Sequence, residues 1–190
     1  MKSQETSIEQ SRRLLELKDI AGYLPYGLKV QDRDMDIWSL SQLGNANPCM
    51  DGDIGLCTDD GSYQQYDYLD KIKPILRPMY DLTKEITHRG ETFVPMVELA
   101  KLSINWVKTV WDVSDNGLFV YGLYGCSGDI IKFYYRPSCF YVSEPNATER
   151  DNDQVILFDK LAEWMFDYRG LISAGLAVDV NMLTENPYEV

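Results

Sequence analysis

Two runs of alternating aromatic and β-branched residues place the strongest constraint on how this chain folds. They cover 118–124 and 130–136, and Gly-Cys-Ser-Gly-Asp separates them at 125–129. Alternation with a period of two is typical of strands, and a short glycine-containing segment between two such runs predicts a β-hairpin. We therefore expect a hairpin over about 118–136 at the centre of an antiparallel sheet.

Two amphipathic segments predict helices that pack on this sheet. In the segment at about 95–111, Pro95 suits the first helical position and apolar residues recur at intervals of three and four. The segment at about 153–168 has the same spacing and stops before Gly170. The predicted fold class is α+β, with the two helices on one face of the sheet and a single domain over 1–190. Shorter strands are expected at 27–31, 35–40, 74–76 and 176–180, and a short helix from Asp81 to about His88.

Composition excludes several classes of protein. The 190 residues are 45% hydrophobic and 25% charged, which is close to the average for soluble globular domains. No apolar run is long enough to span a membrane, and Met1–Lys18 lacks the apolar core of a signal peptide. We therefore expect a cytoplasmic protein with reduced thiols. The spacing of the cysteines does not fit a zinc site. They are Cys49, Cys57, Cys126 and Cys139.

Charge is strongly negative and unevenly distributed. The chain has 18 basic and 30 acidic residues, a formal net charge of −12, so a broad nucleic-acid-binding face is not expected. Nine acidic residues and one basic residue fall within 32–70, a net of −8. Five basic and two acidic residues follow within 71–89, a net of +3. One interpretation is ion pairing between these neighbouring segments, and the other is an acidic surface that attracts a basic partner.

The segment 41–70 is rich in Gly, Asn, Asp and Tyr and predicts a long irregular excursion at the surface. Only Asp53–Thr58 has the character of a strand. Tyrosines offer rigid contact area and carboxylates steer a basic partner, so the excursion is a candidate docking surface for a protein. Arg77, held between two prolines, is either a fixed donor for an anion or half of a buried structural pair. The candidate binding residues are Asp59, Asp60, Tyr63, Tyr66, Asp67, Tyr68, Asp70 and Arg77.

Other chemistry-bearing residues are interpreted as structural. Asp32, Asp34 and Asp36 would share one face of a strand, either as a solvated face or as a cation site, but the residues that follow do not fit a calcium loop. His88, the single histidine, is expected at the C-terminal end of a helix, with a general base as the alternative. No catalytic residue, metal site or cofactor is predicted.

Four blocks of the sequence combine Gly or Pro with large apolar residues, as the ends of packed elements require. The blocks are 23–30, 73–86, 166–172 and 175–181. Together they resemble a group of small uncharacterised proteins from phage and prophage regions of Bacteroidales. The resemblance carries no catalytic or binding residue and implies only a phage-associated accessory protein in a bacterial cytoplasm.

Three functions fit these observations. The first is a non-enzymatic protein-interaction module that docks through the acidic 41–70 region. The second is a nucleic-acid mimic whose carboxylates inhibit a DNA-binding enzyme. The third is an enzyme with a small pocket near Arg77, His88 or Asp32. The sequence favours the first and makes no prediction about the oligomeric state.

Overall fold

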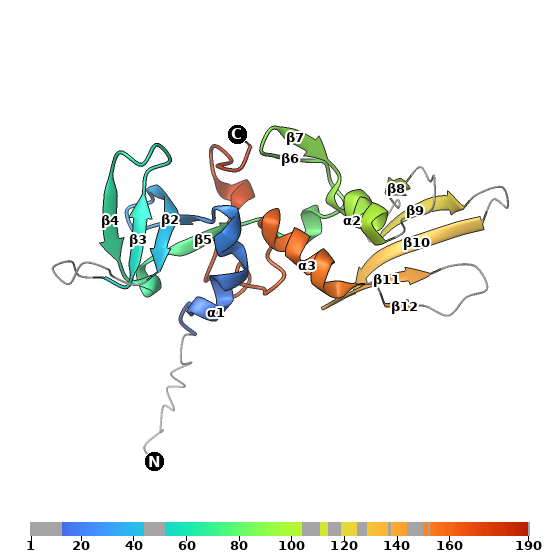
Figure 1. Ribbon diagram of the computed structural model, residues 1–190, viewed down its shortest axis with the longest axis horizontal. Helices are drawn as coiled ribbons and strands as arrows, with labels where there is room; N and C mark the ends of the chain where they lie inside the picture. Colours follow the sequence, from blue (N-terminus) through green and yellow to red (C-terminus); the bar gives the residue numbers. More distant parts are fainter. Residues whose placement is uncertain are drawn as a thin grey trace, which may run out of the picture.

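Two sheets lie at opposite ends of an elongated molecule, and helical segments occupy the space between them (Figure 1). The α+β class is confirmed, but the strands form two larger sheets and a separate hairpin instead of one sheet. The computed structural model describes residues 13–43, 52–103, 111–113, 119–124, 129–136, 138–143, 150–151 and 153–189.

The first sheet has six strands, and its neighbours are antiparallel except for the parallel pair β13–β5. The predicted strands at 27–31, 35–40, 74–76 and 176–180 correspond to β1, β2, β5 and β13. The strands, in the order in which they lie side by side, are β13 (Val178–Asp179), β5 (Lys73–Leu76), β1 (Lys29–Gln31), β2 (Ile37–Leu43), β3 (Ile54–Cys57) and β4 (Gln64–Asp67).

A first hydrophobic core lies between this sheet and the helical segments α1 (Leu17–Ile20) and η1 (Ala21–Tyr26). Val30, Leu56 and Ile75 from the strands are completely buried in it. Burial of one such side chain contributes about 1.5–3 kcal/mol, so these contacts fix the position of β3. Since β4 pairs with β3, the core also fixes the edge of the sheet.

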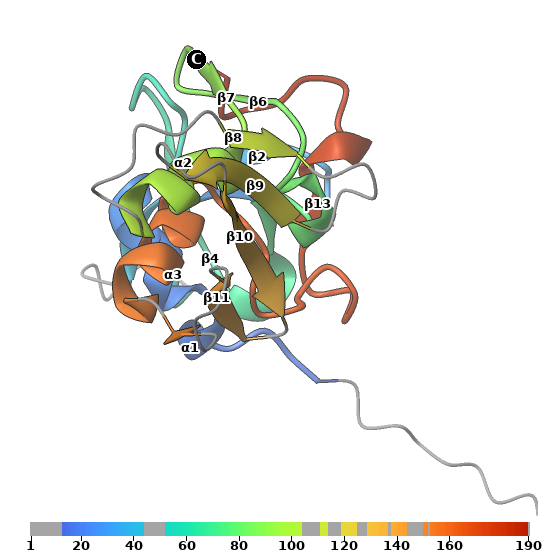
Figure 2. The same cartoon turned by 90° about the vertical axis from the view of Figure 1, so that its right-hand side faces the viewer.

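The second sheet has five antiparallel strands, and Figure 2 views the molecule from that end. The predicted hairpin at its centre is confirmed, with Phe133 opposite Val120. A second core joins Phe133 and Phe140 of this sheet to Leu99 and Leu161 of two helices. The order of strands is β12 (Arg150–Asp151), β11 (Cys139–Ser143), β10 (Asp129–Arg136), β9 (Phe119–Tyr124) and β8 (Trp111–Val113).

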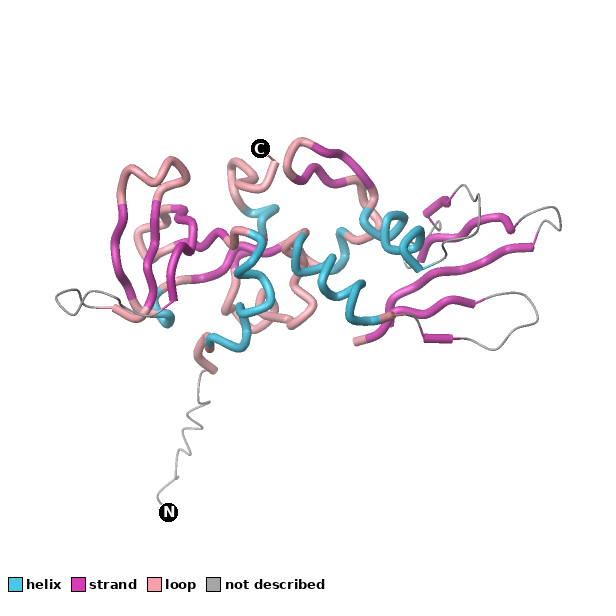
Figure 3. The backbone as a smooth tube through the Cα atoms, in the orientation of Figure 1, coloured by secondary structure: helices cyan, strands magenta, loops and turns pink. Residues whose placement is uncertain are grey.

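Both predicted helices are present but shorter than expected. α2 (Pro95–Ser103) begins at Pro95, yet Trp111 belongs to a strand, and residues 104–110 lie outside the described residues. α3 (Gln154–Glu163) ends early because Met165 has a φ of 62°, which a right-handed helix cannot contain. Figure 3 shows α3 beside η1 in the middle of the molecule. Apolar spacing beyond Glu163 reflects burial after the helix has ended.

The backbone just after α3 joins the two halves. The N–H of Arg77 donates to Met165 O at 2.6 Å, and the N–H of Asp167 donates to Arg77 O at 2.7 Å. These bonds form a short parallel bridge between Arg77 and Phe166, directly after β5. The hydroxyl of Tyr23 donates to Phe166 O at 2.8 Å, so η1 is attached at the same point.

The helix predicted for 81–88 is not formed. A 3-10 helix, η3 (Met79–Asp81), is followed by the hairpin of β6 (Ile86–His88) and β7 (Glu91–Phe93). Arg89 and Gly90 have φ values of 51° and 78°, the combination that a two-residue hairpin turn requires. The turn residues therefore determine the structure here, and His88 lies on a strand.

The segment 41–70 is also more regular than predicted. The strand expected at Asp53–Thr58 is β3, but β4 and the 3-10 helix η2 (Leu69–Lys71) follow it. Residues 44–51 lie outside the described residues. Gln64–Asp67 contains few strand-forming residues, so its pairing with β3 comes from tertiary context. Within the described parts of the chain, no helix has both the length and the apolar character that crossing a membrane requires.

Candidate functional site

Most of the predicted binding residues gather along one edge of the six-stranded sheet. β4 is the last strand in the order, so one of its edges bonds no other described strand. The loop before β4 and the 3-10 helix after it supply the remaining residues. We call this surface the acidic edge. It consists of Asp59, Asp60, Tyr63, Tyr66, Asp67, Tyr68 and Asp70.

Asp60 organises the turn that leads into β4. Its carboxylate accepts hydrogen bonds from Thr58 Oγ1 at 2.7 Å and from the N–H of Ser62 at 2.9 Å. These bonds, that of Thr58 first, lower the pKa of Asp60 to about 2. The side chain is exposed and stays ionised at any physiological pH. The turn therefore presents a fixed negative charge at one end of β4.

Asp59 is neutralised in part by neighbouring strands. The ammonium of Lys29 forms an ion pair with it, and Ser39 Oγ donates to the same carboxylate oxygen at 2.7 Å. The bond from Lys29 is the main cause of a lowered pKa for Asp59. The Asp59 side chain is nevertheless 72% exposed, so water screens the pair.

At the other end of β4, Asp67 pairs with Lys71 at 3.2 Å, and Lys71 Nζ lies 4.6 Å from the ring centroid of Tyr68. Asp70 is exposed and has no ion pair among the described residues. The Asp67–Lys71 pair joins the acidic segment 32–70 to the basic segment 71–89, as one interpretation predicted, whereas Asp59 pairs with Lys29, which lies outside both segments. Lysine pairing of these two carboxylates disfavours a nucleic-acid mimic, which needs rows of uncompensated carboxylates.

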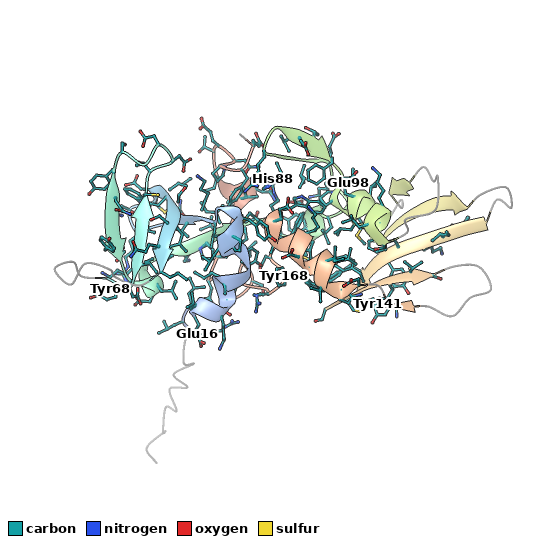
Figure 4. The ribbon with its side chains drawn as sticks, viewed as in Figure 1. Glu16, Tyr68, His88, Glu98, Tyr141 and Tyr168 are labelled. Carbon is teal, nitrogen blue, oxygen red and sulfur yellow. The ribbon has the colours of Figure 1, made fainter. Side chains whose placement is uncertain are left out.

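The tyrosines of the acidic edge are not equally accessible. Tyr63 is 55% exposed, and its ring centroid lies 5.8 Å from that of Trp38. Tyr66 and Tyr68 are half-buried. Tyr68 lies at the six-stranded end in Figure 4, well away from His88 in the middle of the molecule. Tyr63 is thus the main aromatic contact that this surface offers.

Arg77 does not belong to the acidic edge. It is 3% exposed, and its Nη2 donates to Thr87 O at 2.7 Å, while Nε has no hydrogen-bond partner in the part of the chain that the structure describes. Burial lowers the pKa of its guanidinium. Its burial agrees with a structural role, but its hydrogen-bond partner is the Thr87 carbonyl, and among the described residues it is not half of an ion pair.

The aspartates at 32, 34 and 36 do not share a strand face, because they form the turn between β1 and β2. One oxygen of Asp32 accepts from the N–H groups of Asp34 and Asp36 at 3.0 and 2.9 Å. The other accepts from Trp38 Nε1 at 2.8 Å. The Asp32 carboxylate thus closes a turn. Across the described ranges, no group of three or more His, Cys, Asp and Glu side chains is arranged to hold a metal ion.

Two cysteines, Cys57 in β3 and Cys139 in β11, are free thiols in different sheets. Cys49 and Cys126 lie outside the described residues. The predicted reduced state of Cys57 and Cys139 is therefore consistent with the structure.

His88 was expected at a helix end but is buried on β6. Neither ring nitrogen has a hydrogen-bond partner among the described residues, and the ring centroid lies 6.1 Å from that of Tyr188. Burial, followed by the charges of Arg77 and Arg89, lowers the pKa of His88 to about 4. The imidazole is neutral at physiological pH and closed off from solvent, so it cannot act on a substrate in this conformation.

Two hollows lie among the described residues, and one of them is at Asp32, where the enzyme hypothesis places a small pocket. This hollow, of about 450 Å³, is lined by Asp32 and Asp70 among others, but the Asp32 carboxylate is committed to its turn. The other, of about 700 Å³, lies where β7, α2 and α3 meet. Its residues come from three separate segments, and no local pattern could have brought them together.

Comparisons of the chain with protein-family models, with curated proteins and with solved structures gave no significant match.

Proposed function

We propose that this protein is a non-enzymatic interaction module that binds an extended, basic segment of a protein partner along β4. The observation that carries the proposal is a sheet edge without a neighbouring described strand, with the exposed charges of Asp60 and Asp70 at its two ends. An added strand supplies affinity through main-chain hydrogen bonds, and side chains beside the edge select the partner.

The hydrogen bonds of the β3–β4 ladder indicate which backbone groups are available. The N–H of Thr58 donates to Tyr63 O at 3.1 Å, which makes these two residues a hydrogen-bonded pair. Such pairs alternate in an antiparallel ladder, so Leu56 and Gln65 form the next one. Gln64 and Tyr66 then direct their N–H and C=O groups away from β3. An incoming strand can bond to both.

Charge favours a basic partner. Residues 52–70 contain five aspartates and no lysine or arginine, and of these five Asp59 and Asp67 pair with Lys29 and Lys71 from outside the range. A segment with lysine or arginine at alternate positions would place its cations next to these carboxylates and its backbone along β4. The resemblance to phage-associated proteins is consistent with an accessory role of this kind and remains a prediction.

A defined peptide tests the proposal. A labelled peptide of alternating lysine and threonine should bind, and the matched glutamate–threonine peptide should not, when fluorescence anisotropy is measured at low and physiological salt. Gln64→Pro removes one outward N–H without touching the β3 ladder, whereas Gln64→Ala keeps it. Proline should weaken binding about tenfold, because one hydrogen bond is lost and the added strand is displaced.

Charge variants provide the second arm. Asp60→Asn with Asp70→Asn should weaken binding and reduce its salt dependence, whereas Glu185→Gln, an exposed carboxylate elsewhere, should change neither. Equal binding of both peptides, or full binding by the proline variant, would overturn the proposal.

A further inference from the structure

The larger hollow, which we call the α2–α3 groove, has the dimensions of a small-molecule site. Its volume of about 700 Å³ falls within the range of about 300–1,000 Å³ that such sites occupy. It is remote from the acidic edge, at the junction of β7 with the two helices of the second core. Its lining residues are Glu91, Thr92, Phe93, Glu98, Lys101, Leu102, Lys160, Glu163 and Trp164.

Aromatic rings form one wall of the groove. The centroids of Phe93 and Trp164 lie 5.0 Å apart with their planes tilted by 51°, and Trp164 is 7% exposed. Lys160 Nζ lies 5.9 Å from the Trp164 ring centroid. An ammonium group therefore already lies near this indole, in the range where the ring attracts a cation.

The charged groups of the groove leave one carboxylate uncompensated. Lys101 pairs with Glu98 at 2.6 Å, and Lys160 pairs with Glu163 at 2.7 Å. Glu91 is exposed and has no ion pair among the described residues. Three carboxylates and two ammonium groups give the groove a net charge of −1 when each side chain has its usual ionisation.

The β6–β7 hairpin holds this carboxylate beside the aromatic wall. Glu91 is opposite His88, and Phe93 is opposite Ile86. Glu91 and Phe93 are two residues apart on β7, so they project from the same face of the hairpin. Ile86 and His88 are buried and anchor that face against the protein. The β6–β7 hairpin, which is packed against the protein, therefore holds Glu91 and Phe93 on the same face.

We propose that the α2–α3 groove binds a small organic cation, an ammonium ion with an apolar body. The ammonium would lie near Glu91, and the apolar part would contact Phe93, Trp164 and Leu102. Glu91 would repel a carboxylate or phosphate, and a neutral ligand would lack the electrostatic attraction to Glu91. This site is independent of the acidic edge.

Three probes of the same shape and different charge test the ligand class. Phenethylammonium, 2-phenylethanol and phenylacetate are titrated into the full chain, and binding is followed by calorimetry and by NMR of the Trp164 indole. The cation should bind about tenfold more tightly than the alcohol, and phenylacetate should bind most weakly. Equal affinity for the three, or no binding of the cation at millimolar concentration, would refute the proposal.

Two exposed positions allow variants that leave the fold intact. Glu91→Gln should reduce affinity for the cation to that for the alcohol, whereas Glu185→Gln should not. Leu102 is 43% exposed on the groove wall. Leu102→Lys adds a positive charge there, so it should weaken binding of the cation further and strengthen binding of phenylacetate. Leu102→Gln is its neutral control. Unchanged charge selectivity in Glu91→Gln or in Leu102→Lys would contradict the assignment.

Discussion

At the scale of single residues, His88 is the most unusual feature of the molecule. Its ring is buried near Arg77 and Tyr188, and within the described ranges neither nitrogen has a hydrogen-bond partner. A buried polar group without a partner costs about 1–3 kcal/mol. The surrounding charges are mainly positive, so the folded protein favours the neutral form of the imidazole.

Acid should therefore destabilise the protein through His88. The pKa of the residue falls from about 6.5 in the unfolded chain to about 4 in the folded protein, so the unfolded state binds the proton more tightly between these values. Stability contributed by the neutral ring is complete above pH 6.5 and is lost as the pH falls towards 4, by up to about 3 kcal/mol. Urea unfolding at a series of pH values measures this loss.

The matched control is His88→Gln, which cannot titrate. The chain has a single histidine, so the difference between the two proteins isolates its contribution. Asp60, with a pKa of about 2, titrates below this window and affects both proteins equally. If the stability of both proteins depended on pH in the same way between pH 6.5 and 4.5, the pKa of His88 would not be lowered in the folded protein.

At the scale of elements, turns decide structures that apolar periodicity leaves open. Gly90 closes the β6–β7 hairpin at a φ of 78°, and an added Cβ would meet no atom within 4 Å. A side chain at position 90 should therefore lower the free energy of unfolding only through the strain of its backbone conformation, and not through a steric clash.

Gly90→Ala should destabilise the protein by about 1–2 kcal/mol, because alanine is strained in the left-handed region. Gly90→Asn should cost less, since asparagine tolerates that conformation. Thermal unfolding of the two variants gives the comparison. Equal stability of the alanine variant and the natural protein would mean that the turn relaxes to another form.

The same elements explain how far the sequence could predict the fold. The β9–β10 hairpin and the start of α2 were predictable because alternation and Pro95 act locally. The end of α3 was not, because Met165 adopts its φ of 62° while its carbonyl bonds to Arg77. The residues of the acidic edge were predicted, but the strand β4 was not, because it forms only by pairing with β3. The α2–α3 groove was not predicted either, because it is formed by contacts between segments that are distant in the sequence.

At the scale of the whole molecule, two cores share contacts and should unfold together. Tyr168 packs against both of them, and Tyr23 bonds across to the segment after α3. Damage to the first core should therefore also lower the stability measured in the second.

Leu56→Ala tests this coupling. Leu56 is completely buried in the first core, so truncation should cost about 2–5 kcal/mol. Indole NMR signals of Trp38 in the first core and Trp164 in the second should disappear at the same, lower urea concentration. Val155→Ala, at a position 79% exposed, is the control. A Trp164 transition that does not move would show that the halves unfold separately.

The parallel pair β13–β5 also has a consequence for synthesis on the ribosome. β5 ends at Leu76, and the strand that lies beside it begins at Val178. β5 can pair with β1, which is translated earlier, but its other edge lacks a neighbour until about a hundred further residues have been translated. That edge is open to strand pairing with another chain in this interval, and a slow codon placed before β13 should prolong it.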